Sequence, residues 1–202
     1  MGHAGTAPHP VTVTCVVHLT ETAFTTNREF GVVTNRPDAV QAAAAVFTAD
    51  WTRGVEPDPG PLVVSPRNAR EQLHALVDGA QVSLDLYAEV LRDPQLLAAL
   101  AAAAERGVRV RIIISPSPDF AAEIEALTAA GVDIRLSRSL YIHANLIVAD
   151  GERAFVGSQN LSATSLDQNR ELGIIVNDPV NLSRLTRTFA IDFRAATPLE
   201  RS

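Results

Sequence analysis

The sequence predicts a mixed α/β domain, in which a β-sheet is flanked by helices on both faces. From Gly60 onward, short apolar stretches typical of strands alternate with longer segments of helical periodicity. The chain has 202 residues, of which 47% are apolar, so it can bury one substantial core and carry some extra material.

The expected elements follow one another from Pro61. Strands are predicted at 61–65, 82–87, 108–115, 132–136 and 141–149, and helices at 66–78, 94–106, 120–130 and 180–193. In the first helix, Asn68 is a candidate N-cap and Gly79 ends the pattern. The segment 54–60 holds two prolines between flanking glycines, which resist regular structure, so it is the predicted linker.

The chain also repeats itself at an offset of 142 residues. Segment 27–33 aligns without a gap with 169–175, and the two share an Asn-Arg-Glu triplet and an apolar strand pattern. The match continues through a strand, a turn and a helix, since Phe47 falls on Phe189 and Trp51 on Phe193. Residues 1–55 are therefore expected to be the remnant tail of a first repeat, in front of a complete domain at 56–202.

Composition limits the classes of function. All 17 basic residues are arginine, and the formal net charge is -6, so a nucleic-acid partner would need a local arginine patch. The single cysteine allows no internal disulfide, and the spacings assemble no Cys/His metal cluster, so no metal or cofactor is expected. No stretch is long and apolar enough for a transmembrane helix, and no export signal is seen, so a cytoplasmic location is the default expectation. Arginine without lysine in an alanine- and valine-rich chain is typical of a GC-rich bacterial genome.

Polar residues gather on the strand at 141–149 and on the segment after it. His143 and Asn145 are two positions apart, so a continuous strand would direct both side chains to the same face of the sheet. Asp150 then begins a tight turn into the next apolar stretch.

Short hydrogen-bonding groups follow this turn. Gly157 lets the backbone bend, and Ser158 and Asn160 present side chains suited to phosphate oxygens. Glu171 begins the next strand, where its carboxylate could accept a hydrogen bond from one ring nitrogen of His143 and make the other more nucleophilic.

These positions together resemble the signature of the phospholipase D-like phosphodiesterase superfamily. The resemblance covers roughly residues 60–198, including the lead-in at 101–114. The residues that carry it are His143, Asp150, Gly157, Ser158, Asn160, Asn169, Arg170 and Glu171.

This resemblance implies a metal-free, two-step attack on a phosphodiester. A motif histidine forms a phosphohistidine, and a histidine from a second motif serves as acid and base. By the same resemblance, His143 is the nucleophile or its acid/base partner, and Glu171 orients it. Ser158 and Asn160 would bind phosphate, with Asn145 as a weak further donor, while Asp150 has a structural role.

The sequence departs from the family at two points. Asn145 stands where the motif lysine belongs, and losing one preorganised donor typically costs on the order of 10²–10³ in rate. The chain has no lysine to replace it, so the positive charge would have to come from an arginine such as Arg138. The second departure is that Met1 falls on His143 in the repeat comparison, so only one motif is present. The second would have to come from a homodimer or from a missing N-terminal half.

The predicted activity is therefore the hydrolysis or transfer of phosphatidyl groups, weakened by Asn145 and the missing motif. The acidic balance favours phospholipid over nucleic acid as the substrate. Two alternatives stay open, a homodimeric endonuclease of the same superfamily and a catalytically inactive phosphate-binding remnant. Arg109 and Arg111, which alternate on one strand, could serve the nuclease, although charges at a sheet end are usually solvated.

Overall fold

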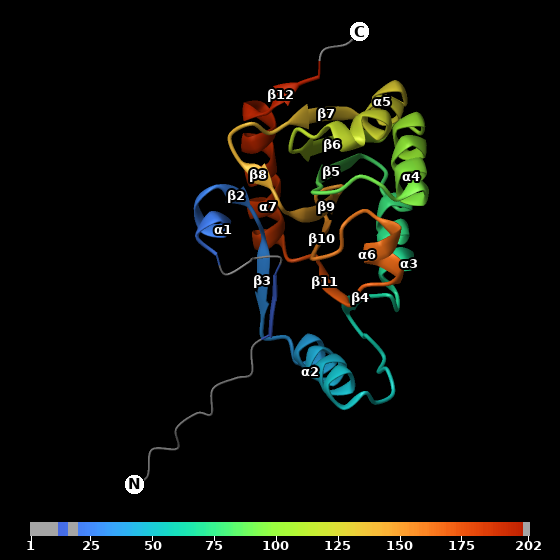
Figure 1. Cartoon of the computed structure of the whole chain (residues 1–202), viewed down its shortest axis with the longest axis vertical. Helices are drawn as coiled ribbons and strands as arrows, with labels where there is room; N and C mark the ends of the chain where they lie inside the picture. Colours follow the sequence, from blue (N-terminus) through green and yellow to red (C-terminus); the bar gives the residue numbers. More distant parts are fainter. Residues whose placement is uncertain (1–11, 16–19, 200–202) are drawn as a thin grey trace.

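A computed structural model of the chain describes residues 12–15 and 20–199, and Figure 1 shows its architecture. Eight strands form one mixed sheet in the order β12-β7-β6-β5-β9-β10-β11-β4, and two further pairs, β1-β3 and β2-β8, lie outside it. The strands β5, β6 and β7 are parallel, and the other neighbours in the large sheet are antiparallel.

The bounds of the elements are as follows. In chain order they are β1 (Thr12–Cys15), α1 (Glu21–Thr25), β2 (Asn27–Arg28), β3 (Gly31–Thr34), α2 (Pro37–Thr52), β4 (Leu62–Ser65), α3 (Ala69–Asp78), β5 (Ser83–Tyr87), α4 (Pro94–Glu105), β6 (Arg109–Ile114), the 3₁₀ turn η1 (Pro118–Phe120), α5 (Ala121–Ala129), β7 (Asp133–Leu136), β8 (Tyr141–Ile142), β9 (Asn145–Ala149), β10 (Arg153–Gly157), α6 (Ala163–Asp167), β11 (Glu171–Val176), α7 (Pro179–Ala195) and β12 (Thr197–Pro198).

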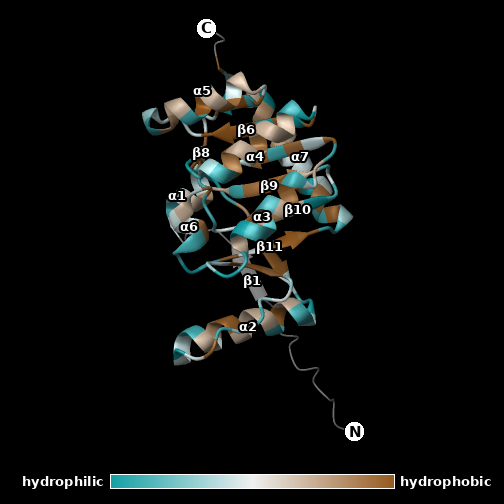
Figure 2. Ribbon diagram, turned by 90° about the vertical axis from the view of Figure 1, so that its right-hand side faces the viewer, coloured by the Kyte–Doolittle hydropathy of each residue, from teal (hydrophilic) through white to brown (hydrophobic). Residues whose placement is uncertain are grey.

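Helices cover both faces of the large sheet, as the sequence predicted. Leucines of α3, α4, α5 and α6 pack with one set of strand side chains into one core, and α7 packs Phe189 and Phe193 against the opposite set in a second core. The hydropathy colouring in Figure 2 shows the apolar strands between these helical layers. Because residues alternate along each strand, the two faces of one sheet supply two separate cores.

The predicted element order from Pro61 is confirmed, with shifts of a few residues at the ends. The first helix begins at Ala69 instead of Pro66, with Asn68 at the N-cap position as predicted, although the Asn68 side chain binds the backbone of Val64 and Leu62 and not the first turn of the helix. The predicted strand at 141–149 was wrong as one unit, since it is divided into β8 and β9 around His143 and Ala144.

An N-terminal segment, residues 12–55, precedes the main domain and repeats part of its structure. The elements β1, α1, β3 and α2 have counterparts in β10, α6, β11 and α7 that lie 142 residues further along the chain. Strand register repeats as well, since Thr12 pairs with Thr34 where Ala154 pairs with Val176. The hairpin of β1 and β3 lies against β10 and β11, so the two similar units face each other. Met1, which aligns with His143, is outside the described residues.

Candidate active site

His143 lies in the break between β8 and β9, where the N-terminal segment meets the main domain. The strand β8 pairs in parallel with β2, so Asn27 lies opposite Tyr141 and Arg28 opposite Ile142. The pairing continues one step further, because the backbone N–H of His143 donates to the carbonyl of Arg28 over 3.2 Å. This register brings the next residue of the N-terminal segment, Glu29, to the side of the histidine.

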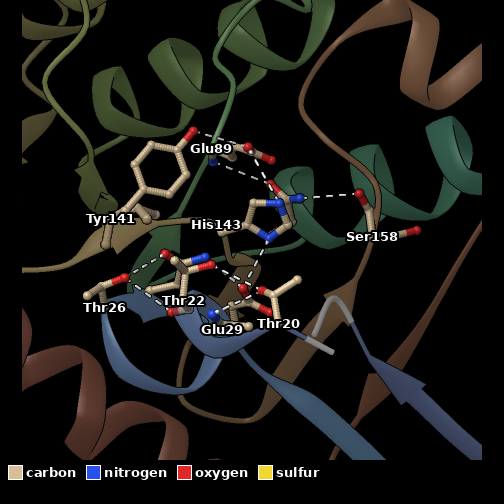
Figure 3. Close-up of polar contacts among 12 residues, drawn as sticks. Thr20, Thr22, Thr26, Glu29, Glu89, Tyr141, His143 and Ser158 are labelled. Atoms are coloured by element: carbon tan, nitrogen blue, oxygen red, sulfur yellow. Dashed lines mark hydrogen bonds and ion pairs between the residues drawn. The ribbon is translucent and has the colours of Figure 1, made fainter. Parts of the chain in front are cut away.

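The imidazole of His143 lies between two carboxylates. Its Nδ1 is 3.6 Å from Oε1 of Glu29, and its Nε2 is 3.7 Å from Oε1 of Glu89, as Figure 3 shows. The Glu29 side chain is only 3% exposed, and Asn27 donates a hydrogen bond to its Oε1 over 2.9 Å. A buried, fixed carboxylate on the Nδ1 side of the ring leaves Nε2 on the opposite side, toward Glu89.

Glu89 belongs to the loop after β5 and is held by Tyr141. The Tyr141 hydroxyl donates to Oε1 of Glu89 over 3.3 Å. Partial burial, the negative charge of Glu89 and this hydrogen bond together raise the pKa of Tyr141 above its ordinary value, so the phenol keeps its proton and acts as a donor. Nε2 of His143 is therefore next to a negative charge.

Asn145, the residue in place of the motif lysine, is turned into the protein. It is 3% exposed, its Nδ2 donates to the carbonyl of Ser158, and its Oδ1 accepts from the backbone N–H of Glu89. The oxygen and the nitrogen of this one side-chain amide thus tie β9 to the loops that carry Glu89 and Ser158. Although β9 begins only at Asn145, the side chains of His143 and Asn145 both reach Glu89, the first at its carboxylate and the second at its backbone N–H.

Of the two expected phosphate ligands, Ser158 has its side chain engaged inside the protein, whereas the side-chain oxygen of Asn160 has no partner among the described residues. The Ser158 hydroxyl accepts from the backbone N–H of Leu172 over 3.2 Å and faces the Leu172 carbonyl. Asn160 donates its backbone N–H to Ser165, while its buried side-chain oxygen Oδ1 has no hydrogen-bond partner within the described chain. Phosphate binding by Ser158 would therefore need its hydroxyl to turn away from β11.

Glu171 does not contact His143, which corrects the expectation that it orients the ring. Its Oε1 accepts from the Ser165 hydroxyl over 2.6 Å and from Asn169 over 2.9 Å, and its Oε2 is buried without a hydrogen-bond partner among the described residues. The carboxylate beside the imidazole is instead that of Glu29, the residue 142 positions before Glu171.

Asp150 is at the far end of β9 from His143, and the structure does not bring it to the imidazole. Its carboxylate accepts from the backbone N–H groups of Gln81, Val82 and Ser83, where β5 begins. Burial alone would raise the pKa of Asp150, but the hydrogen bonds from Ser83, Gln81 and Val82 and the charge of Arg153 outweigh it, so the pKa lies below its ordinary value. Asp150 fixes the fold around the site.

Gly157 is needed for close packing and not, as expected, for a bend. It lies within β10 opposite Gly173, and a methyl group added to it would come within 2.5 Å of the Phe155 ring and of the Gln159 side chain. Its φ is not in the left-handed region. Glycine at this position lets the two strands and the Gln159 side chain approach one another.

Neither Arg138 nor Arg111 forms an ion pair with Glu29 or Glu89. The recorded ion pairs of Glu29 and Glu89 are both with His143, and no hydrogen bond or ion pair joins the exposed Arg138 to them. Arg111 is also committed elsewhere, in a bidentate pair with Asp85. Between residues 20 and 199, no group of three or more His, Cys, Asp or Glu side chains is arranged to hold a metal ion.

Sequence reasoning missed Glu29, Glu89 and Tyr141. The repeat held the signal for Glu29, because the Asn-Arg-Glu triplet at 27–29 matches the one at 169–171. Glu29 was missed because each glutamate was expected to contact the histidine of its own repeat. Glu89 and Tyr141 carry no comparable signal, since they are single polar residues at strand ends.

A scan against family models matches residues 73–193, more than half of the chain, to the family described as "Cardiolipin synthase, PLD-like domain". The chain is 27% identical over 196 residues to a cardiolipin synthase of Geobacillus kaustophilus (strain HTA426), covering 82% of this chain and 39% of that protein. It is 34% identical over 116 residues to the mitochondrial cardiolipin hydrolase of Xenopus laevis, with 55% of this chain and 54% of that one covered. The chain thus spans less than two thirds of these relatives.

Solved structures show the same fold. Nuc from Salmonella typhimurium, a phospholipase D family member, superposes with a TM-score of 0.63 at 22% identity, over 69% of this chain and 97% of that one. Polyphosphate kinase from Porphyromonas gingivalis superposes with a TM-score of 0.74 at 17% identity, over 94% of this chain and 31% of that one. Because the second match covers 94% of this chain, it includes most of the N-terminal segment. A similar arrangement of this segment and the sheet is therefore present within that longer protein. With the family model, the fold and the histidine in its motif in agreement, the chain belongs to the phospholipase D-like superfamily, in the family described as the PLD-like domain of cardiolipin synthase.

Proposed function

We propose that this chain is part of a phosphodiesterase that hydrolyses or transfers phosphatidyl groups through a phosphohistidine on His143. The observation that carries the proposal is the contact of the His143 Nδ1 with the buried carboxylate of Glu29, which directs Nε2 toward a substrate. Relatives named cardiolipin synthase and cardiolipin hydrolase favour a phospholipid substrate. No helix between residues 20 and 199 is long and apolar enough to cross a bilayer.

The reaction would proceed in two displacements. Nε2 attacks phosphorus, the bond from phosphorus to the leaving alcohol oxygen breaks, and that oxygen takes up a proton. Water or an acceptor alcohol then attacks the phosphohistidine, the phosphorus–nitrogen bond breaks, and the incoming hydroxyl loses its proton. Glu29 stabilises the positive charge that develops on the ring in the first displacement, because it is buried close to Nδ1.

The rate is expected to be low. Asn145 supplies no charge and is engaged with Ser158 and Glu89, while the carboxylate of Glu89 lies beside the attacking nitrogen. At 4 Å and an effective dielectric constant of 20, two like unit charges repel by about 4 kcal/mol, so an anionic phosphodiester is disfavoured where Glu89 is ionised.

We also infer that residues 1–55 derive from the tail of a first repeat. The matched register of the two hairpins and the equal spacing of their helices support this history better than chance similarity does.

An inactive phosphate-binding module is the second candidate, and the neutral, internally bonded Asn145 in place of the motif lysine favours it over an enzyme, although the Ser158 hydroxyl would have to turn before it could bind phosphate. Binding without chemistry would then be the whole function. The homodimeric nuclease has less support, because the N-terminal segment already covers β10 and β11.

The test is turnover of phosphatidylcholine vesicles and of bis(4-nitrophenyl) phosphate, with acid quenching to trap a phosphorylated histidine. We expect slow turnover and a trapped adduct that both vanish in His143→Gln but persist in His74→Gln, a histidine on α3. Turnover that is equal in both variants would refute the role of His143. Phosphate-dependent thermal stabilisation without any turnover would favour the inactive module.

A further inference from the structure

A long groove lies between the helix α5 and the strand β7, near one edge of the large sheet. Its volume is about 1270 Å³, which exceeds the range of about 300–1,000 Å³ typical of small-molecule sites. The loop 116–118 lines it at one end, and Pro198 of β12 and the following Leu199 line it at the side. Figure 1 shows α5 beside β7 at the β12 end of the sheet. The groove has room for a long ligand.

The side chains that β7 turns toward α5 are apolar. Ile134, which lines the groove, is 2% exposed and belongs to the core on the α5 side of the sheet. Because side chains alternate along a strand, those of Asp133 and Arg135 lie on the opposite face. There Arg135 donates to the carbonyl of Phe193 over 3.0 Å and lies over the Phe193 ring. The charge that α5 brings to the lining, Glu125, is exposed to solvent.

Prolines make up part of the lining as well. Pro116, Pro118 and Pro198 all border the groove. A proline has no backbone N–H, so these residues offer no backbone donor to a phosphate or a carboxylate. An uncharged, apolar ligand therefore suits the groove better than an anionic one.

The groove does not suit an added β-strand. The strand β7 has four residues, and β12 already pairs with two of them, Leu136 and Arg135. Recognition by strand addition needs an open edge, and a typical strand has about 5–6 residues. The part of β7 that β12 leaves open, Asp133 and Ile134, is too short for this, so a flexible apolar chain is the better occupant.

One end of the groove lies beside the candidate active site. The parallel strands β5, β6 and β7 end at the same edge of the sheet, where Glu89 follows β5 and Ser115 and Pro116 follow β6. The Ser115 hydroxyl accepts a hydrogen bond from the backbone N–H of Ile142 over 2.7 Å. Ile142 directly precedes His143. The Pro116 end of the groove is thus tied to the segment that carries the imidazole.

We propose that this groove binds an acyl chain of the phospholipid whose phosphate is attacked by His143. The glycerol part of the lipid spans from the imidazole to Pro116, and the chain runs along α5 from Ala121 toward Ala129. The occupant is the substrate's own acyl chain and not a separate lipid, because the groove begins at the edge of the sheet where His143 lies. The assignment rests on the function proposed above, since it takes the lipid phosphate to lie at His143.

Monomeric phosphatidylcholines with two butanoyl or two hexanoyl chains test the assignment. Two more methylene groups of one chain enter the groove in the hexanoyl lipid, so kcat/KM should rise on the order of tenfold, mainly through KM. Ala121→Trp places an indole in the groove and should remove most of this gain. Ala122→Trp, at the next exposed position of α5 and outside the lining, is the matched control and should keep it.

The same gain in both tryptophan variants would overturn the proposal. Decanoate separates the substrate's own chain from another lipid, since we expect it to inhibit turnover of the hexanoyl lipid competitively. Decanoate that binds without slowing this turnover would assign the groove to a separate lipid and overturn the proposal as well. If Ala121→Trp does not fold, Ala129→Trp at the other end of α5 decides. It should lower the ratio of decanoyl to hexanoyl turnover in detergent micelles, and an unchanged ratio would sink the idea.

The two proposals fail separately, because calorimetry measures binding of the same lipids without turnover. Binding that strengthens with chain length and weakens in Ala121→Trp, without turnover of any substrate, would leave the groove in place and count against the proposed function. Turnover that requires His143 but does not depend on chain length would do the opposite.

Discussion

At the scale of single residues, the site is defined by what surrounds one imidazole. Glu29 and Glu89 lie beside its two nitrogens, and two of the groups expected to hold phosphate, Asn145 and Ser158, have protein partners. The same types of residue that serve catalysis elsewhere in this superfamily therefore serve partly to hold the fold here. Substitutions at Glu29 and Asn145 separate these roles.

Glu29→Gln should lower turnover by about 10–100-fold, the usual cost of losing the group that orients a functional histidine. The amide keeps the shape of the side chain but removes the charge that balances the ring. Glu171→Gln in the same 202-residue chain should change turnover little, because Glu171 contacts Ser165 and Asn169 instead of His143. Steady-state rates with bis(4-nitrophenyl) phosphate provide the measurement, and an equal loss in both variants would contradict this assignment.

Asn145→Lys should raise turnover only modestly, whereas Asn145→Lys combined with Glu89→Gln should raise it on the order of 10²-fold. The Asn145 side chain accepts from the backbone of Glu89, so a lysine at this position would have its ammonium close to the Glu89 carboxylate and pair with it. Glu89→Gln alone is the control, because it removes the repulsion between Glu89 and the phosphodiester without adding a lysine. The same rate in the single and double variants would show that Glu89 does not hold the ammonium, and no rise in either would count against a competent site.

At the scale of elements, strand ends and turns determine where the functional groups lie. Apolar patterns predicted the strands and helices from Pro61 well, because the central strands are short runs buried on both faces and the helices bury one apolar face. It did not predict the break at His143, since the apolar pattern of 141–149 continues through it. The break arises from pairing with β2, a contact with a segment more than a hundred positions away that no local pattern encodes.

The turn at Asp150 gives a prediction on pH and stability. Its depressed pKa means that its contribution is fully present above the pKa of an unfolded aspartate, about 3.9, and is lost as the pH falls through the lower pKa of the folded state. Asparagine tolerates the positive φ of 56° at this position, but it accepts weaker hydrogen bonds than a charged carboxylate. Asp150→Asn should therefore lower the free energy of unfolding by about 1–3 kcal/mol at pH 7.

This cost should shrink when urea unfolding is repeated toward pH 3, because below the unfolded pKa of about 3.9 the unfolded carboxylate binds a proton more readily than the folded one. Asp119→Asn, at an exposed position, should stay within about 0.5 kcal/mol at every pH. A cost for Asp150→Asn that is constant from pH 7 to pH 3 would mean that shape, and not charge, holds the turn.

At the scale of the whole molecule, the N-terminal segment and the main domain form one interface with a polar centre. Asp192 accepts two hydrogen bonds from Arg28 and one from the Tyr87 hydroxyl, whose pKa is raised by burial and by that hydrogen bond. The reciprocal pair of Arg170 and Asp50 is more exposed. We therefore expect the more buried pair, Arg28 with Asp192, to contribute more to the free energy of unfolding. The two pairs occupy equivalent positions in the repeat, so the sequence alone does not distinguish them.

Arg28→Met should lower the free energy of unfolding by about 1–3 kcal/mol, because it removes a bidentate partner from a carboxylate that is only 15% exposed. Arg170→Met should cost about 0–1 kcal/mol, as expected for a pair near the surface, and Arg36→Met, within the N-terminal segment, should cost no more than that.

Arg28→Met should also slow turnover, although Arg28 does not touch the imidazole ring, since its carbonyl and the adjoining Glu29 position His143. Urea unfolding and turnover, measured on the same three variants, check both effects. If Arg28→Met loosens the N-terminal segment, limited proteolysis should cut at the linker 54–60 before the main domain unfolds. Equal stability of the Arg28 and Arg170 variants would show that the difference in burial between the two pairs has no energetic consequence.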